Sequence, residues 1–156
     1  MTQITTGQQI DPRGVDHPAH YNKHPSGIEA IEVCRFMNFN VGSAFKYVYR
    51  RGDKVEHGMT KEQAIQKDLN KALWYIRDER KNCCGVPVAG YGVGAVKAGV
   101  QALINVIVHE SNHEAAEVYR SFSYLGTCCD SQEYLEALEA LDTDMEALKK
   151  HECSAV

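Results

Sequence analysis

The sequence predicts an all-α protein: a compact helical domain of three short helices, followed by a C-terminal pair of longer amphipathic helices. Three observations predict this class. Apolar residues recur at helical spacing, residues suited to capping a helix stand before several of these segments, and no segment alternates as a half-buried strand would. The composition, with 44% hydrophobic and 24% charged residues, is typical of a globular protein.

Charge is divided unevenly along the 156 residues. Residues 1–81 hold 13 basic and 10 acidic residues, whereas residues 82–156 hold 4 basic and 11 acidic ones. The acidic total argues against a general nucleic-acid coat, so we expect no nucleic-acid polymer as a partner. We expect three regions: a flexible arm over 1–15, a helical domain over 16–81, and a glycine-rich connector with an acidic helical packing or oligomerisation region over 82–156.

The first helices are predicted from their boundary residues. Pro18 and Pro25 exclude a helix interior between residues 16 and 27. Ser26 and Glu29 have the spacing of a capping box, which predicts a helix over 27–37. The next helix is expected over 40–51, with Gly52 ending it.

The helix over 40–51 has two different faces. Its apolar face, expected to enter the core, contains Val41, Phe45, Val48 and Tyr49. Its other face gathers basic and aromatic side chains around Ser43, namely Lys46, Tyr47, Arg50 and Arg51, and Lys54 follows in the turn. Clustered cations and the paired donors of arginine suit an anion, and tyrosine can stack on a base. The same pattern is also typical of a solvated charged face.

A third helix is predicted over 61–81, with Thr60 as its cap. Asp68, Lys71 and Tyr75 share one flank of this helix, where they are placed to meet a sugar, a phosphate and a base. An intrahelical ion pair beside an interface tyrosine is the alternative. Trp74 points nearly opposite the apolar stripe, so it either meets another element or is exposed.

The second half is expected to be helical after a glycine-rich hinge. A long helix is predicted over 96–124, and a last helix over 131–150. The last helix carries apolar residues in a 4-3-4-3 pattern that spans only two heptads, so we expect it to pack on another helix, within the chain or across subunits of a homo-oligomer. These residues are Tyr134, Leu138, Leu141, Met145 and Leu148.

Histidines mark two further candidate sites. His17, His20, Tyr21 and His24 lie in one loop segment, where histidine can carry a proton or meet a phosphate. The segment from His109 to His113 matches His-Glu-x-x-His, the helical zinc motif of metal hydrolases, and Glu117 is a possible third ligand. We expect no metal in the main interpretation and keep this hydrolase as an alternative, because no strand for substrate binding is visible.

The remaining features bear on where the chain works. No apolar run approaches the roughly 18 residues needed to span a bilayer, so we expect no membrane partner. The start of the chain lacks the basic and apolar regions of a signal peptide. Four of the 6 cysteines stand in adjacent pairs, which rarely form a disulfide with each other. We therefore expect a cytoplasmic protein with reduced thiols.

Three segments, DHPAHYNKHPSGIEAIEVC, GSAFKYVYRRGDK and DLNKALWYIRDE, resemble the small phage-encoded SaV-like family, long labelled a domain of unknown function and often described as nucleotide kinases. The resemblance covers roughly residues 15–80. Ser43 departs from it, because the family usually has Asn there. The matching positions are His20, Tyr21, Gly42, Ala44, Lys46, Tyr47, Arg50, Gly52, Lys54, Asp68, Leu69, Lys71, Ala72, Trp74 and Tyr75.

The resemblance implies a phage protein in the cytoplasm of the infected cell that handles nucleotides. It implies transfer of phosphate to deoxynucleoside monophosphates without a P-loop, with a nucleoside triphosphate as donor and Mg²⁺ as a possible cofactor. The expected catalytic residues are His20, Arg50 and Asp68. A non-enzymatic binder that sequesters a host nucleotide immune signal, of cyclic nucleotide or ADP-ribose type, is the alternative. The expected nucleotide-binding residues are Tyr21, Ser43, Lys46, Tyr47, Arg50, Arg51, Lys54, Lys71, Trp74 and Tyr75.

Overall fold

The computed structural model describes residues 18, 21, 23–82, 93–128 and 130–154 of the chain. These residues form six helices and no strand, which confirms the all-α class. The helices are α1 (Ala30–Cys34), α2 (Phe39–Tyr49), α3 (Lys61–Asn82), α4 (Val93–His109), α5 (His113–Leu125) and α6 (Ser131–Ser154).

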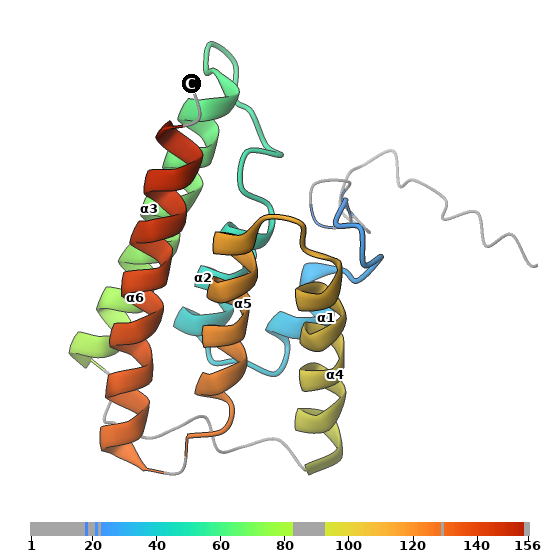
Figure 1. Cartoon of the computed structure of the whole chain (residues 1–156), viewed down its shortest axis with the longest axis vertical. Coiled ribbons are helices and arrows are strands. Elements are labelled where there is room, and N and C mark those ends of the chain that lie inside the picture. Colours follow the sequence, from blue (N-terminus) through green and yellow to red (C-terminus); the bar gives the residue numbers. More distant parts are fainter. Residues whose placement is uncertain (1–17, 19–20, 22, 83–92, 129, 155–156) are drawn as a thin grey trace, which may run out of the picture.

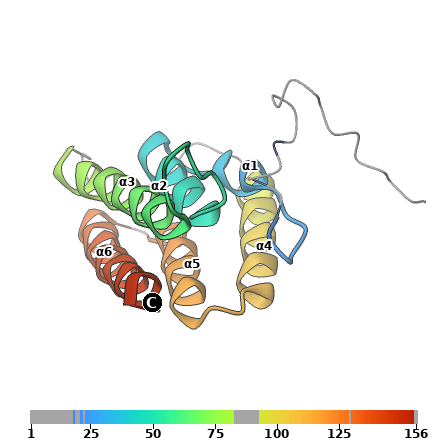
Figure 2. The ribbon, with the colours of Figure 1, turned by 90° about the horizontal axis from the view of Figure 1, so that it is seen from above.

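The helices form two layers of three (Figures 1 and 2). Seen from above, α1, α2 and α3 lie side by side in one layer, and α4, α5 and α6 lie in the other (Figure 2). Each helix of the first layer contacts one helix of the second layer: α3 contacts α6, α2 contacts α5 and α1 contacts α4. The acidic second half therefore covers one whole side of the first half.

A single hydrophobic core lies between the layers. The predicted apolar face of α2 is confirmed, because Val41, Phe45, Val48 and Tyr49 are all buried. The 4-3-4-3 pattern of α6 also faces this core, so it packs within the chain. Its members Tyr134, Leu138, Leu141, Met145 and Leu148 are each at most 1% exposed.

The first helix differs from its prediction. α1 has five residues, Ala30–Cys34, and its capping box joins Glu29 to Glu32. The predicted cap, Ser26, is used elsewhere: its hydroxyl accepts from the backbone N–H of Ile28 and lies 2.8 Å from Nδ1 of His24. The proposed helix over 27–37 was therefore too long at both ends.

The predicted long helix over 96–124 is two helices. α4 ends at His109, and α5 begins at His113. Asn112 causes the break, because its extended backbone places its side chain to accept from the N–H of Ala115 as an N-cap. Glu110 adds to this turn by accepting from the N–H of Asn112.

The turn between α2 and α3 follows the predicted signals. Gly52 adopts a φ of 75°, in the left-handed region that favours glycine. Thr60 and Gln63 form a reciprocal capping box at the start of α3, since each side chain accepts from the other residue's N–H. These signals set the angle at which α3 returns along α2.

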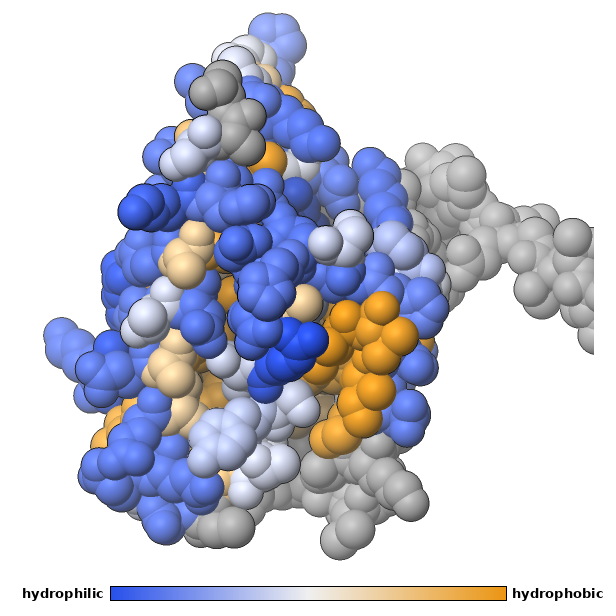
Figure 3. Space-filling model, in the orientation of Figure 1, coloured by the Kyte–Doolittle hydropathy of each residue, from blue (hydrophilic) through white to orange (hydrophobic). Residues whose placement is uncertain are grey.

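α4 leaves an apolar patch on the surface. Ile104 is 41% exposed and Val108 is 71% exposed. Figure 3 shows a hydrophobic patch on the face where Figure 1 places α4. No helix among the described residues is long and apolar enough to cross a membrane.

Candidate functional site

The ring of Tyr47 has three cations around it, at the contact between α2 and α3. Arg50 and Lys46 come from α2, and their Cζ and Nζ atoms lie 4.7 Å and 4.9 Å from the ring centroid. Lys71 comes from α3, with Nζ 5.2 Å from the same centroid. Two of the sequence-predicted groups, the basic face of α2 and the flank of α3, are thus brought together. We call these four residues the cationic cluster.

Arg50 of the cationic cluster forms a buried ion pair with Asp68. Nη2 of Arg50 donates to Oδ1 of Asp68 at 3.0 Å, and the two residues are 7% and 3% exposed. Nη1 of Arg50 donates to the Tyr21 hydroxyl at 3.3 Å. Within the described part of the chain, Nε of Arg50 and Oδ2 of Asp68 are buried without a hydrogen-bond partner. Arg50 and Asp68, the two predicted catalytic residues that the structure describes, therefore each keep one polar atom without a partner.

An aromatic strip extends from the cationic cluster along the surface. Tyr75 stacks on Tyr47, with centroids 5.9 Å apart, and it contacts Phe39 at 5.9 Å and Trp74 at 5.1 Å. Phe39 is 77% exposed and Trp74 is 60% exposed. Exposed rings of this kind can stack on a nucleobase. We call Phe39, Trp74 and Tyr75 the aromatic strip.

Phe39 is a site residue that the sequence interpretation missed. It lies four residues before Ser43 and seven before Lys46, which places all three on one face of α2. A large apolar residue on a polar face was the available signal. It went unnoticed because the predicted helix began one residue later, at residue 40.

A pocket of about 660 Å³ opens on the other side of Lys46. It lies between α1 and the start of α2, and Ser43 is in its wall. Other lining residues include Tyr21, Ile31, Arg35, Met37 and Phe39. Ser43 therefore belongs to this pocket, and the structure shows no contact from it to the ring of Tyr47.

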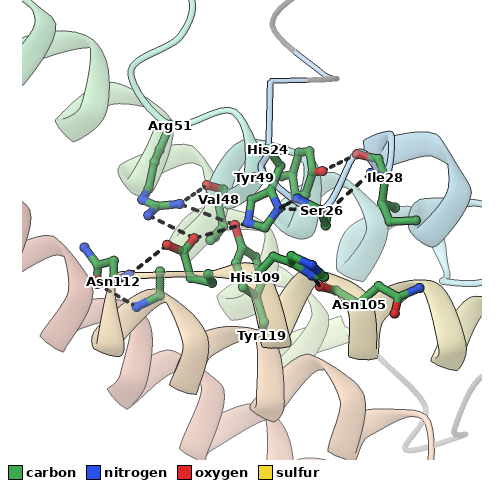
Figure 4. Close-up of polar contacts among 12 residues, drawn as sticks. His24, Ser26, Ile28, Val48, Tyr49, Arg51, Asn105, His109, Asn112 and Tyr119 are labelled. Atoms are coloured by element: carbon green, nitrogen blue, oxygen red, sulfur yellow. Dashed lines mark hydrogen bonds and ion pairs between the residues drawn. The ribbon is translucent and has the colours of Figure 1, made fainter. Parts of the chain in front are cut away.

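Arg51 and Lys54 join neither the cationic cluster nor the pocket beside it. Arg51 turns away, toward the second half of the chain (Figure 4). Lys54 is exposed in the turn after α2. His20 lies outside the described residues, as does His17. Arg51 points away because its acidic partners, Glu110 and Glu152, both lie in the second half of the chain.

Arg51 instead organises a second, largely buried polar cluster. Its Nε donates to Glu152 at 2.9 Å, and its guanidinium lies 3.5 Å from Glu110 and 3.3 Å from the Tyr119 hydroxyl. His24 joins it, with Nε2 3.5 Å from Glu110 and its ring stacked on Tyr49. The cluster ties the N-terminal loop, α2, the turn before α5 and α6 together (Figure 4).

The surroundings shift the pKa values of three groups in this second cluster, Glu110, Tyr119 and Arg51. Burial alone would raise the pKa of Glu110, but the His24 ring at 3.5 Å, the hydrogen bond from the Asn112 N–H and the nearby Arg51 charge lower it to about 2. Burial raises the pKa of Tyr119 to about 12. For Arg51, burial acts to lower the pKa, but Tyr119, Glu152 and Glu110 raise it overall. The cluster is therefore a structural ion-pair network at neutral pH.

The His-Glu-x-x-His segment does not form a helical metal motif. His109 ends α4 and His113 starts α5, so the two side chains do not share a helical face. His109 uses Nδ1 with the Asn105 carbonyl at 2.8 Å, and Glu117 pairs with Arg120. No group of three or more His, Cys, Asp or Glu side chains able to hold a metal exists in the described ranges. The described residues therefore give no support to the alternative of a helical zinc site.

The described cysteines differ in their surroundings. Burial raises the pKa of Cys34 to about 12, and its Sγ donates to the Gly42 carbonyl. Cys128 is buried and Cys153 is exposed. The other three cysteines, Cys83, Cys84 and Cys129, lie outside the described residues.

Comparison with known proteins places a family domain on this site. Residues 15–77 match the model of a family described as a protein of unknown function (DUF3310). No curated protein and no solved structure matches the chain. The matched segment spans α1, α2 and most of α3, so it contains the whole cationic cluster and the aromatic strip.

Proposed function

We propose that this chain binds nucleoside phosphates at the cationic cluster and transfers phosphate to nucleoside monophosphates without a P-loop. The observation that carries the binding proposal is the convergence of Lys46, Arg50 and Lys71 around the ring of Tyr47. A single face there offers positive charge for phosphate and exposed rings for a base. A nucleotide uses both the positive charge and the exposed rings, whereas an uncharged metabolite has no phosphate for the charge to bind.

The two lysines are the phosphate ligands in this proposal. Lys46 and Lys71 are only partly buried, so their ammonium groups can reach a ligand from solvent. Arg50 is covered and already paired with Asp68 and Tyr21, so it acts mainly by holding the cluster in place. Phosphoryl transfer depends mostly on positioning and on cations around the transferred group, which this arrangement supplies.

A non-enzymatic nucleotide binder is the second candidate, and one observation favours it. The two described residues expected to take part in catalysis, Arg50 and Asp68, are bonded to each other and shielded from solvent. Binding by Lys46, Lys71 and the aromatic strip does not need either of them to react. Such a protein would sequester its nucleotide and release no product.

Titration calorimetry with nucleoside mono- and triphosphates tests binding. Lys46→Ala and Lys71→Ala are each expected to weaken binding about 10- to 100-fold, because each removes a charge-assisted contact worth about 1.5–3 kcal/mol. Lys81→Ala, an exposed lysine of the last turn of α3, is the matched control and should bind like the wild type. Unchanged binding by both cluster variants would move the site elsewhere.

Turnover separates the two candidates. The protein is incubated with a nucleoside monophosphate and a triphosphate donor, and the products are separated by chromatography. Diphosphate formation that is lost in Lys71→Ala supports the kinase. Tight binding without any diphosphate would leave the sequestering binder as the function.

We further propose that two copies of the chain meet through the exposed apolar face of α4. Lys97 is the only Lys, Arg, Asp or Glu between Val93 and His109, whereas each copy carries a net charge of -4. A face with a single basic residue and no acidic one lets two acidic copies approach with little repulsion. Light scattering should show a dimer that Val108→Glu converts to a monomer, and a monomeric wild-type protein would contradict this assembly.

A further inference from the structure

The pocket beside Lys46 shares three residues with the surroundings of the cationic cluster. Lys46 lines the pocket and also lies against the Tyr47 ring. Tyr21 lines the pocket and accepts from Arg50. Phe39 lines the pocket and contacts Tyr75 of the aromatic strip. The pocket and the strip are therefore two compartments on either side of one lysine.

The chemistry of the pocket suits a nucleoside. Its volume of about 660 Å³ lies in the range of small-molecule sites. Ile31, Met37 and Phe39 give it apolar walls, and the Ser43 hydroxyl makes no hydrogen bond within the described residues. Arg35 and Lys46 supply positive charge where a phosphate attached to that nucleoside would leave the pocket.

Two polar side chains in the pocket wall already form hydrogen bonds within the protein, so fewer polar groups remain to recognise a ligand. The Asn38 amide donates to Glu79 and its oxygen caps α2. The Cys34 thiol donates to the Gly42 carbonyl. Apolar contact and the Ser43 hydroxyl are therefore what the pocket offers to a base or sugar. Its charged lining residues are Glu29, Arg35 and Lys46.

We propose that this pocket is a second nucleoside compartment, so that the site binds two nucleosides joined through phosphates that lie at Lys46 and Lys71. The inference rests on the proposed nucleotide binding and adds the class of ligand. Phe39 and Lys46 are seven residues apart, or about 10 Å along the helix, so a nucleoside against Phe39 can carry a phosphate that reaches Lys46. The ligand is a dinucleoside polyphosphate, or a donor and an acceptor nucleotide held together.

The chain carries its own reporters for both compartments. Trp74 is the only tryptophan, and it lies in the aromatic strip. Met37 lines the pocket, whereas Met145 is 0% exposed in the core and serves as an internal control. A dinucleoside tetraphosphate should change the Trp74 fluorescence and shift the Met37 methyl resonance with one common dissociation constant. Met145 should not move.

A blocking variant tests the pocket directly. Ile31→Tyr places bulk at a 54% exposed lining residue, and Val55→Tyr, at a 48% exposed position in the turn after α2, is its control. We expect Ile31→Tyr to weaken dinucleoside tetraphosphate binding at least 10-fold and to leave pyrophosphate binding unchanged. The control should bind both ligands like the wild type.

The outcomes separate this inference from the proposed function. Lys71→Ala should weaken both the dinucleoside tetraphosphate and pyrophosphate. If Lys71→Ala weakens both ligands but Ile31→Tyr weakens neither and the Met37 methyl is unmoved at saturation, the second compartment is wrong while nucleotide binding stands. If Lys46→Ala and Lys71→Ala both bind every phosphate ligand normally, the nucleotide site itself is wrong.

Discussion

Arg50 shows how a residue on a polar face can become part of the interior. Its spacing from Lys46 and Tyr47 predicts an exposed cation, yet only 7% of it is exposed. The difference is Asp68, which reaches it from α3 and compensates the buried charge. Burying an arginine without such a partner would be costly, so the pair must be considered together.

Arg50→Ala is expected to lower the free energy of unfolding by about 3–5 kcal/mol, because it leaves the Asp68 carboxylate buried without its partner. The double variant Arg50→Ala/Asp68→Ala should be less destabilised than the sum of the two single variants. Urea unfolding measures this. Arg77→Ala, which breaks an exposed ion pair with Asp142, is the control and should cost about 0–1 kcal/mol. Strictly additive effects of the Arg50 and Asp68 variants would show that the pair is not coupled.

Glu110 makes the stability of the folded chain depend on pH. Its pKa in the folded chain is about 2, below the ordinary value of 4.5. Because the folded value is lowered, its contribution to stability is complete above about pH 4.5 and is lost as the pH falls toward 2. The wild type should therefore lose more stability over this range than Glu110→Gln does.

Denaturant unfolding of the wild type and Glu110→Gln at pH 7, 4.5 and 3 tests this pH dependence. At pH 7, Glu110→Gln should be less stable than the wild type by about 1–3 kcal/mol, because it weakens the contacts to His24 and Arg51. Glu117→Gln, on the exposed side of α5, should stay within about 0.5 kcal/mol of the wild type at pH 7. Parallel pH profiles of the wild type and Glu110→Gln would contradict the role of this carboxylate.

At the scale of elements, the turn from α2 to α3 decides whether the site forms. Gly52 combines a φ of 75° with a close neighbour, since an added Cβ would lie 2.5 Å from Cγ1 of Ile65. Ile65 is in the core at the start of α3. The turn therefore sets how α3 lies against α2, and with it the approach of Lys71 to Tyr47.

Gly52→Ala and Gly58→Ala form a matched pair. Gly58 has a similar φ of 79° but nothing within 4 Å of an added Cβ. We expect Gly58→Ala to cost about 1–2 kcal/mol from the backbone alone, and Gly52→Ala to cost about 2–5 kcal/mol because Ile65 must also move. Thermal unfolding of the two variants gives the comparison. Equal losses of stability in the two variants would mean that the contact with Ile65 does not add to the destabilisation.

At the scale of the whole molecule, the two layers depend on each other. The face of α3 that contains Leu69, Leu73 and Ile76 is buried, and α6 is the helix of the second layer that contacts α3. One core cluster includes residues from both layers. The second half is therefore part of the same folding unit as the segment that matches the family model, whatever role it has in assembly.

A fragment of residues 1–82 is expected not to fold cooperatively, because it lacks the layer that covers this apolar face. Circular dichroism should show a broad thermal transition, and its amide NMR spectrum should show poor dispersion. Adding the fragment 93–156 should restore some native signal. A sharp, sigmoidal transition of the first fragment alone would show that the first layer is an independent domain.

By itself the sequence determined the helical class, the core faces of α2 and α6, the turn at Gly52 and the cap at Thr60, because periodicity and capping act over a few residues. It also indicated Lys46, Tyr47, Asp68, Lys71 and Tyr75 as a set. Only the tertiary structure decided that Arg50 is buried, that Arg51 faces the second half and that the His109–His113 segment is broken. Those outcomes depend on partners far away in the chain, such as Asp68 and Glu152, which no local spacing can reveal.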